Sequence, residues 1–312
     1  FGNKKIGRAL GILFALCGAI NCVPSCATQI LSATSQVKVF NWNEKIFGII
    51  IIAFVALIVF GGIKRIAAFM EKIVPFMALV YLAGVIIILI VNAGSILPTL
   101  GSIFTYAFTK HAAVGGFAGS TIALAMRWGI ARGVYSNEAG FGTAAIAHSA
   151  SDVDHPIRQA MWGVFEVALD TLVICTATAL AVLSTGAWTQ EGVSSGALAQ
   201  AAFGSVFGHA GEIFVAICVL LFVITPIIVV VYYGEKNMQF IFGNVTAGTV
   251  WRYVSFLGMI GALFGIELTV AFQLTDFFGA LKIIPNMLAL LWLLPQIIIL
   301  NKEFFHTPGK YY

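Results

Sequence analysis

Residues Ile73 to Val91 read IVPFMALVYLAGVIIILIV and contain no charged side chain. A helix needs about 20 apolar residues to cross the hydrocarbon core of a bilayer, where every backbone polar group must be hydrogen-bonded within the protein. The runs Ile46–Ile63 and Ile283–Leu300 meet the same requirement. These three runs predict an all-α polytopic membrane protein.

The composition of the whole chain agrees with this prediction. Of its 312 residues, 60% are hydrophobic and only 10% are charged, which is too little polar material to cover a soluble globular domain. Five weaker apolar stretches raise the predicted number of membrane segments to eight: Arg8–Ser35, Val114–Ser149, Gln159–Gly186, Glu212–Tyr233 and Thr249–Ile266.

The positions of lysine and arginine between these segments predict the orientation in the membrane. With the N-terminus in the cytoplasm, eleven basic residues lie inside and four lie outside, as the positive-inside rule requires. Both ends of this chain are therefore predicted to be cytoplasmic, in a multi-pass protein of the cell membrane. The net charge of +4 reflects this topology and does not indicate nucleic acid binding. The residues placed outside are Lys38, Lys45, Lys110 and Lys282.

A short internal repeat predicts the architecture. Lys72–Met77 (KIVPFM) recurs as Lys282–Met287 (KIIPNM), and the predicted topology makes the two copies run in opposite directions. Inverted repeats of this kind are typical of secondary transporters, although short matches between apolar helices also arise by chance. The expected parts are the remainder of a first repeat with three membrane helices (1–93), an extracellular connection (94–113), a second repeat with five membrane segments (114–300) and a cytoplasmic tail (301–312).

The segment Val114–Ser149 carries an unusual number of polar residues and glycines for a membrane span. Glycine lowers the cost of unwinding a helix, and an unwound turn offers free carbonyl groups to a cation and free N–H groups to a carboxylate. We therefore predict a site-forming turn at Gly133–Asn137. Arg127, Arg132 and Glu138 lie beside it, and we interpret these charges as structural ion pairs near the cytoplasmic face.

Several motifs of the chain resemble, in the same order, those of the alanine/glycine:cation symporter family, also called the sodium:alanine symporter family. The most specific one lies in the segment just described, where Ser136–Gly142 reads SNEAGFG. Further matches are AAIAH at Ala144–His148, DHPIRQ at Asp154–Gln159, DTLVICT at Asp170–Thr176 and YYGE at Tyr232–Glu235. The resemblance covers nearly all of the chain.

This resemblance implies a leucine-transporter-type inverted-repeat fold. It also implies symport of a small neutral amino acid, such as alanine or glycine, with a cation that is sodium in the family. Three helices would precede Arg8 in a complete transporter, among them a broken helix that supplies half of the substrate and sodium sites. The chain is therefore expected to be N-terminally incomplete and to lack its first helices, so it could not transport alone by the family mechanism.

The resemblance further implies which residues contact the substrate. Tyr135 stands where a phenylalanine covers the substrate in the family, and the backbone around it lines the site. Val230 stands where the family has a tryptophan, so the pocket of this chain is expected to be larger. The predicted substrate-binding residues are Gly133, Tyr135, Ser136, Asn137, Gln29 and Val230.

The predicted cation ligands are Thr225, Asn137 and Asp170. Thr225 keeps one of the two neighbouring hydroxyl residues that suit sodium in the family, and Pro226 replaces the other. Asp170 shares a helix face with Glu166, one turn before it. A carboxylate within the membrane can bind a cation or carry a proton, and a hydrogen-bonded packing role is the alternative.

The departures from the family pattern leave other functions open. With Pro226 and Val230 the chain could belong to an uncoupled facilitator or channel, or to a truncated homologue that does not transport. An enzyme is not expected, because no catalytic motif is present. The resemblance implies no cofactor other than the transported sodium ion. We interpret His148 and His155 as part of a solvated loop, and not as metal ligands.

Overall fold

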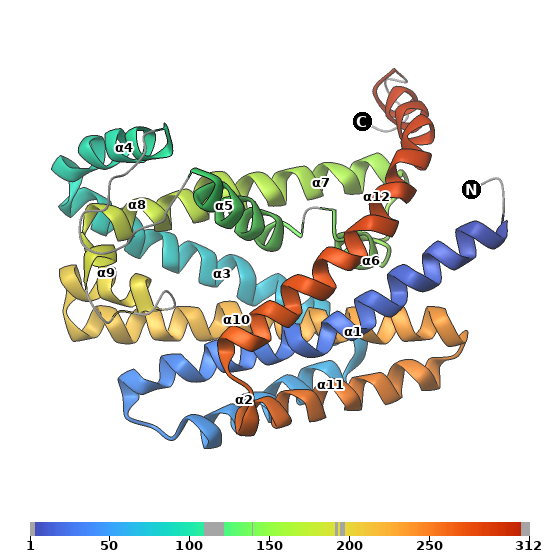
Figure 1. Ribbon diagram of the computed structural model, residues 1–312, viewed down its shortest axis with the longest axis horizontal. Helices are drawn as coiled ribbons and strands as arrows, with labels where there is room; N and C mark the ends of the chain where they lie inside the picture. The colour runs from blue at the N-terminus through green and yellow to red at the C-terminus, as the bar shows by residue number, and fades with distance from the viewer. Residues whose placement is uncertain (1–3, 109–121, 139, 191–192, 194–196, 307–312) are drawn as a thin grey trace. The chain divides into compact units, whose positions relative to one another are not determined.

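The computed structural model describes residues 4–108, 122–138, 140–190, 193 and 197–306, and every regular element in these ranges is a helix (Figure 1). The helices are α1 (Lys4–Gln36), α2 (Glu44–Val59), α3 (Gly62–Val91), α4 (Ala93–Phe108), α5 (Ile122–Ser136), α6 (Thr143–His148), α7 (Pro156–Ala168), α8 (Thr176–Ser184), α9 (Leu198–Phe207), α10 (His209–Phe242), α11 (Val245–Gly265) and α12 (Leu268–His306). A π-helical segment, Leu169–Cys175, joins α7 to α8 without interruption.

Six helical spans in the described residues are long and apolar enough to cross a membrane. They are α1, α3, the α7–α8 rod over Pro156–Ser184, α10, α11 and α12. The prediction of an all-helical chain with several membrane spans is confirmed, whereas the number of eight is not. α2 has only 16 residues, and the segment Val114–Ser149 contains two separate helices, with residues 114–121 outside the described part.

Three helices extend well beyond the apolar runs that predicted them. α3 already begins at Gly62, α10 continues to Phe242 and α12 begins at Leu268. As a result, Lys282 is not a loop residue outside the membrane segments, as predicted, but lies within α12 with only 4% of its surface exposed. Hydropathy marks the apolar part of a helix, so it misses polar turns that continue the same helix against protein.

The chain divides into two compact units, each described here by itself. The first comprises Phe1–Lys72, Gly140–Val167 and Phe222–Tyr312. In it, α1 packs against α2, α11 and α12 (Figure 1). A small residue also lets α1 approach α10 closely, since a Cβ added to Gly18 of α1 would lie 2.6 Å from Asn237 Nδ2 of α10.

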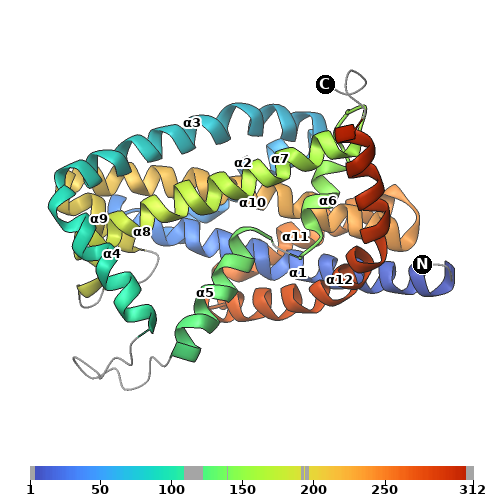
Figure 2. The same ribbon diagram turned by 90° about the horizontal axis from the view of Figure 1, so that it is seen from above.

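The second unit comprises Ile73–Ala139 and Ala168–Leu221, and in it α8 packs against both α4 and α9 (Figure 2). Its core contains Phe203, which is 1% exposed and stacks on Tyr81 and Phe214 with ring centroids 5.8 and 5.6 Å away. The Tyr81 hydroxyl is 3.0 Å from the Thr178 hydroxyl on α8. The polar end of this buried tyrosine is therefore satisfied within the unit.

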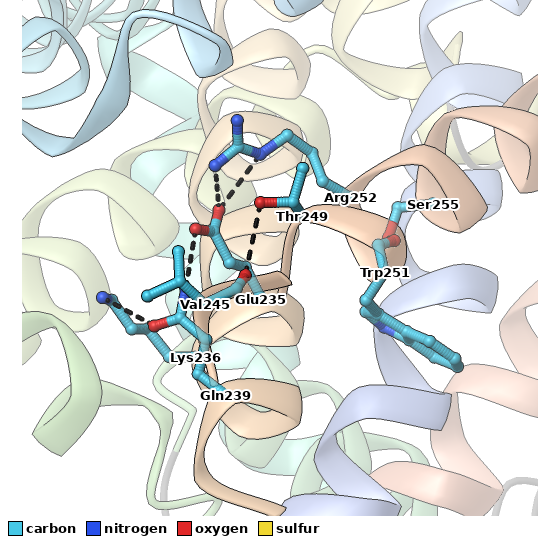
Figure 3. Close-up of polar contacts among 8 residues, drawn as sticks. All are labelled: Glu235, Lys236, Gln239, Val245, Thr249, Trp251, Arg252 and Ser255. Atoms are coloured by element: carbon cyan, nitrogen blue, oxygen red, sulfur yellow. Dashed lines mark hydrogen bonds and ion pairs between the residues drawn. The ribbon is translucent and has the colours of Figure 1, made fainter. Parts of the chain in front are cut away.

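An ion pair joins α10 to α11 in the first unit (Figure 3). Arg252 donates from Nη2 and Nε to the same carboxylate oxygen of Glu235, over 2.6 and 3.1 Å, and the side chains are only 14% and 11% exposed. Gln239 donates to the other carboxylate oxygen over 3.0 Å. The Arg252 guanidinium also lies 5.2 Å from the ring centroid of Phe60, which follows α2. This network connects three helices of the unit.

Replacing Arg252 with methionine is expected to lower the stability of the first unit. The substitution leaves the shielded Glu235 carboxylate without the two hydrogen bonds and the positive charge of Arg252, which we expect to cost about 2 kcal/mol. The measurement is thermal unfolding of the purified protein in detergent. Lys236→Met is the matched control, because Lys236 contacts only the outer edge of the network, through Gln239 Oε1 at 3.1 Å. Equal melting temperatures for both variants would contradict this role.

Candidate functional site

The helix of the SNEAGFG motif is broken. α5 ends at Ser136, α6 begins at Thr143, and Glu138, Gly140 and Gly142 all have positive φ angles, of 49°, 77° and 74°. Glycine adopts such angles at no steric cost, whereas a residue with a side chain such as Glu138 is held there under strain. The predicted interruption of this segment is therefore present, on the C-terminal side of the predicted turn.

The predicted turn itself, Gly133–Asn137, is mostly helical. Gly133 lies within α5, and the backbone N–H and the side-chain Nδ2 of Asn137 both donate to the Gly133 carbonyl, each over 3.1 Å. The break between α5 and α6 thus lies about one helical turn after the predicted turn. The tripeptide Gly140–Gly142, with two glycines in left-handed backbone geometry, was the better signal.

The C-terminal end of α5 meets the π-helical segment in the second unit. Ser136 Oγ donates to Asp170 Oδ2 over 2.7 Å, and Thr171 Oγ1 donates to Asn137 Oδ1 over 2.8 Å. Cys175 Sγ lies 3.9 Å from the same Asp170 oxygen. The structure thus brings together three of the predicted residues, Ser136, Asn137 and Asp170, and adds Thr171, which the prediction did not include.

The backbone geometry explains why these side chains converge. A π-helical turn inserts one extra residue per turn, so it changes the face on which successive side chains lie and is frequent at functional sites. Asp170 and Thr171 are adjacent in the sequence, yet both reach the end of α5. Sequence periodicity gave no warning of this turn, because the apolar pattern around it fits an α-helix equally well.

The chemistry of this group suits a small hard cation. It contains a half-buried carboxylate, two hydroxyl groups and an amide oxygen, and the last carbonyl groups of α5 are close by. Hard cations prefer oxygen ligands, and broken helices of transporters use such carbonyl groups and side chains to bind sodium. We call Ser136, Asn137, Asp170 and Thr171 the oxygen cluster.

The other predicted site residues have separate environments. Tyr135 is half-buried on α5, with the Arg132 guanidinium 5.4 Å from its ring centroid. Gln29 is half-buried on α1 in the first unit, where α10 also carries the buried Thr225 and the half-buried Val230. The Val230 carbonyl accepts a hydrogen bond from Cys22 Sγ of α1 over 3.1 Å.

The C-terminal side of the break, at Gly140–Gly142, packs on α12 within the first unit. Asn286 Nδ2 donates to the Gly140 carbonyl over 2.9 Å, and Phe141 is 7% exposed. A cavity of about 570 Å³ adjoins this contact. Its lining comprises Phe14, Gly142, Ala145, Ile146, Ser149, Ala150, Tyr232, Lys236 and Asn286.

The loop after α6 is only partly the solvated loop that we predicted. Asp154 and Arg158 form an exposed ion pair of 3.0 Å. His155, in contrast, is 4% exposed, and its ring centroid lies 5.0 Å from that of Phe304 on α12.

The described residues contain six apolar spans and a polar break in one helical segment, and these are features of a multi-pass membrane transporter. The comparison with known families agrees, since the model of the sodium:alanine symporter family matches residues 3–310. The chain belongs to this family.

Several proteins are similar in sequence to this chain over most of its length. The transporter YflA of Bacillus subtilis, described as uncharacterized, is 40% identical over 97% of this chain and 64% of its own length. The sodium/alanine symporter AgcS of Methanococcus maripaludis is 33% identical over 97% of this chain and 66% of its own length. The probable sodium/glutamine symporter GlnT of Bacillus subtilis is 35% identical over 85% of this chain. The chain thus spans somewhat less than two thirds of the length of the first of these relatives.

Proposed function

We propose that this chain is part of a symporter that carries a small neutral amino acid into the cell together with sodium. The observation that carries the proposal is the oxygen cluster at the end of α5, in a chain of the sodium:alanine symporter family. The cluster supplies the oxygen ligands that a sodium ion needs. The driving force is the ion gradient, so no catalytic group and no cofactor are required beyond the transported ion.

We propose that Asp170 is the main cation ligand and that Asn137, which was also predicted, is a second ligand beside it. The Asp170 carboxylate accepts the hydrogen bond of Ser136 over 2.7 Å. A sodium ion would take the place of that proton donor, and the hydroxyl oxygen of Ser136 would then turn its lone pairs to the ion.

The substrate belongs to the class of small neutral amino acids, and relatives of this chain are named for alanine and for glutamine. We propose that Gly133, Tyr135, Gln29 and Val230 contribute to its binding, and that Thr225 contributes to the cation site. Valine at position 230 is smaller than the tryptophan of the family pattern. It favours a substrate of the size of glutamine as well as alanine and glycine.

The transport cycle that we propose is alternating access in an inverted-repeat fold of the leucine-transporter type. The amino acid and the cation bind from outside, and the repeats then move to expose both to the cytoplasm. The basic residues between the spans favour cytoplasmic ends for this chain. Reporter fusions at its two ends would test that orientation, since both reporters should be active on the cytoplasmic side only.

The test of the proposed function is uptake by the protein at the full length its gene encodes, purified and reconstituted in vesicles. Labelled alanine, glycine and glutamine are supplied with an inward gradient of sodium, of potassium or of protons. We expect accumulation above equilibrium with the sodium gradient only. Equilibration at the same rate in every ionic condition would identify an uncoupled facilitator, and absence of uptake of all three amino acids would contradict the proposed function.

A further inference from the structure

A positive charge is buried in α12, apart from the oxygen cluster. Lys282 is 4% exposed, although it lies in the middle of a 39-residue helix that is otherwise apolar over long stretches. Burying an ammonium group within a membrane protein is costly, so such a residue generally has a functional role. The proposed binding of substrate and sodium does not use Lys282.

The Lys282 side chain points to the break between α5 and α6. Its Nζ lies 4.3 Å from the ring centroid of Phe141, which is within the range of a cation–π contact. Because both side chains are more than nine-tenths buried, water does not screen this attraction. Phe141 is therefore held by a charge as well as by apolar packing.

A hydrogen bond fixes the ammonium group from the other side. With the Asn21 amide assigned by its hydrogen bonds, Asn21 Oδ1 accepts from Lys282 Nζ over 3.2 Å and Asn21 Nδ2 donates to the Thr275 carbonyl over 2.9 Å. Asn21 is 4% exposed on α1. Lys282 of α12 thus contacts Asn21 of α1 and Phe141, which precedes α6, and all three residues belong to the first unit.

One face of α12 forms the rest of the surface on which Phe141 packs. Gly279, Lys282 and Asn286 are spaced three and four residues apart, so they lie on the same side of the helix. A Cβ added to Gly279 would lie 3.2 Å from Phe141 Cζ, which shows how closely the ring approaches the α12 backbone. Asn286 holds the neighbouring carbonyl group of Gly140.

We propose that Lys282 is a positioning residue, which holds Phe141 and with it the segment Gly140–His148 on α12. The contact forms a latch, defined by Phe141, Gly279, Lys282 and Asn286. Transporters change conformation at broken helices, so the strength of this latch controls how firmly Gly140–Gly142 stay in place on α12 during transport. Its effect on transport, which rests on the proposed function, falls on the maximal rate and not on the affinity for substrate.

The test of the latch itself is hydrogen–deuterium exchange of the amides in Gly140–His148, which requires no transport. Lys282→Met is expected to increase their exchange rate about tenfold, the effect of losing a buried cation–π contact. Lys282→Arg keeps the cation and should exchange within about twofold of the wild type. Lys302→Met removes an exposed charge from the same helix and should have no effect.

The double variant distinguishes the latch from independent packing contacts. Phe141→Leu alone should increase the exchange as much as Lys282→Met, and combining the two should add little, because each removes the same contact. The proposed latch is contradicted if the increases in exchange rate of the two single variants multiply in the double variant. It is also contradicted if Lys282→Met exchanges at the wild-type rate. If Lys282→Met does not fold, the other two variants test the latch. The amides of Gly140–His148 must then exchange faster than in the wild type in Phe141→Leu, and at about the wild-type rate in Lys282→Arg.

Uptake by the same full-length variants tests the consequence for transport. We expect the maximal rate of Lys282→Met to fall about fivefold, with a half-saturating amino-acid concentration within about twofold of the wild type. A rise in the half-saturating concentration without a change in maximal rate would contradict a positioning role. Lack of uptake by the wild type would refute the proposed function, whereas the exchange data would still decide the latch.

Discussion

Asp170→Asn is expected to abolish sodium-driven uptake at ordinary sodium concentrations. The carboxylate is the one formal negative charge of the oxygen cluster, and asparagine keeps its shape but not its charge. Two unit charges 4 Å apart attract by about 4 kcal/mol in partly buried surroundings, and half of that value already weakens sodium binding about thirtyfold. The measurement is the sodium concentration that gives half-maximal uptake of labelled alanine in vesicles.

Glu166→Gln is the matched control for this substitution. Glu166 lies one turn before Asp170 on the same rod, its side chain is 74% exposed, and it is 3.8 Å from His148 Nε2. It loses the same charge by the same change of atoms. We expect its sodium dependence to equal that of the wild type, so an equal loss in both variants would show that Asp170 has no specific role.

Gly142→Ala is expected to lower both the stability and the transport rate of the protein strongly. Residue 142 has a φ of 74°, and a Cβ there would lie 2.6 Å from Asn286 Oδ1 and 2.8 Å from Phe14 Cε2. Asn286 cannot turn away freely, because its Nδ2 is bonded to the Gly140 carbonyl. Backbone strain and overpacking together should cost about 3 kcal/mol. Thermal unfolding in detergent and uptake in vesicles measure the two losses.

Gly129→Ala serves as the control for Gly142→Ala. Gly129 is an α5 residue, and among the described residues beyond its own helical backbone no atom lies within 4 Å of an added Cβ, so alanine there should be tolerated or slightly stabilising. If Gly142→Ala unfolds and transports like Gly129→Ala, the break does not require the backbone geometry described here.

The sequence predicted the helical class and the position of most spans, because long apolar runs in lipid leave the backbone no other choice. It also predicted an interruption in the segment of the SNEAGFG motif, although about one turn too early. Hydropathy could not separate α2, which has 16 residues, from a complete membrane span. The inverted repeat and the boundaries drawn from it stay predictions.

The candidate site was only partly predictable. Ser136, Asn137 and Asp170 were expected to belong to the site, and the structure brings them together. The hydrogen bond of Thr171 to Asn137 was not predicted, because it depends on a π-helical turn that has no clear sequence signature. Lys282 was misplaced outside the membrane segments, since a sequence does not reveal that Phe141, distant along the chain, covers a charge on α12.

Binding of radioactive sodium to the purified full-length protein measures directly whether a sodium site lies at the end of α5. We expect saturable binding by the wild type and by Glu166→Gln, and at least about tenfold weaker binding by Asp170→Asn. Saturable binding of equal strength in Asp170→Asn would contradict a sodium site at the end of α5.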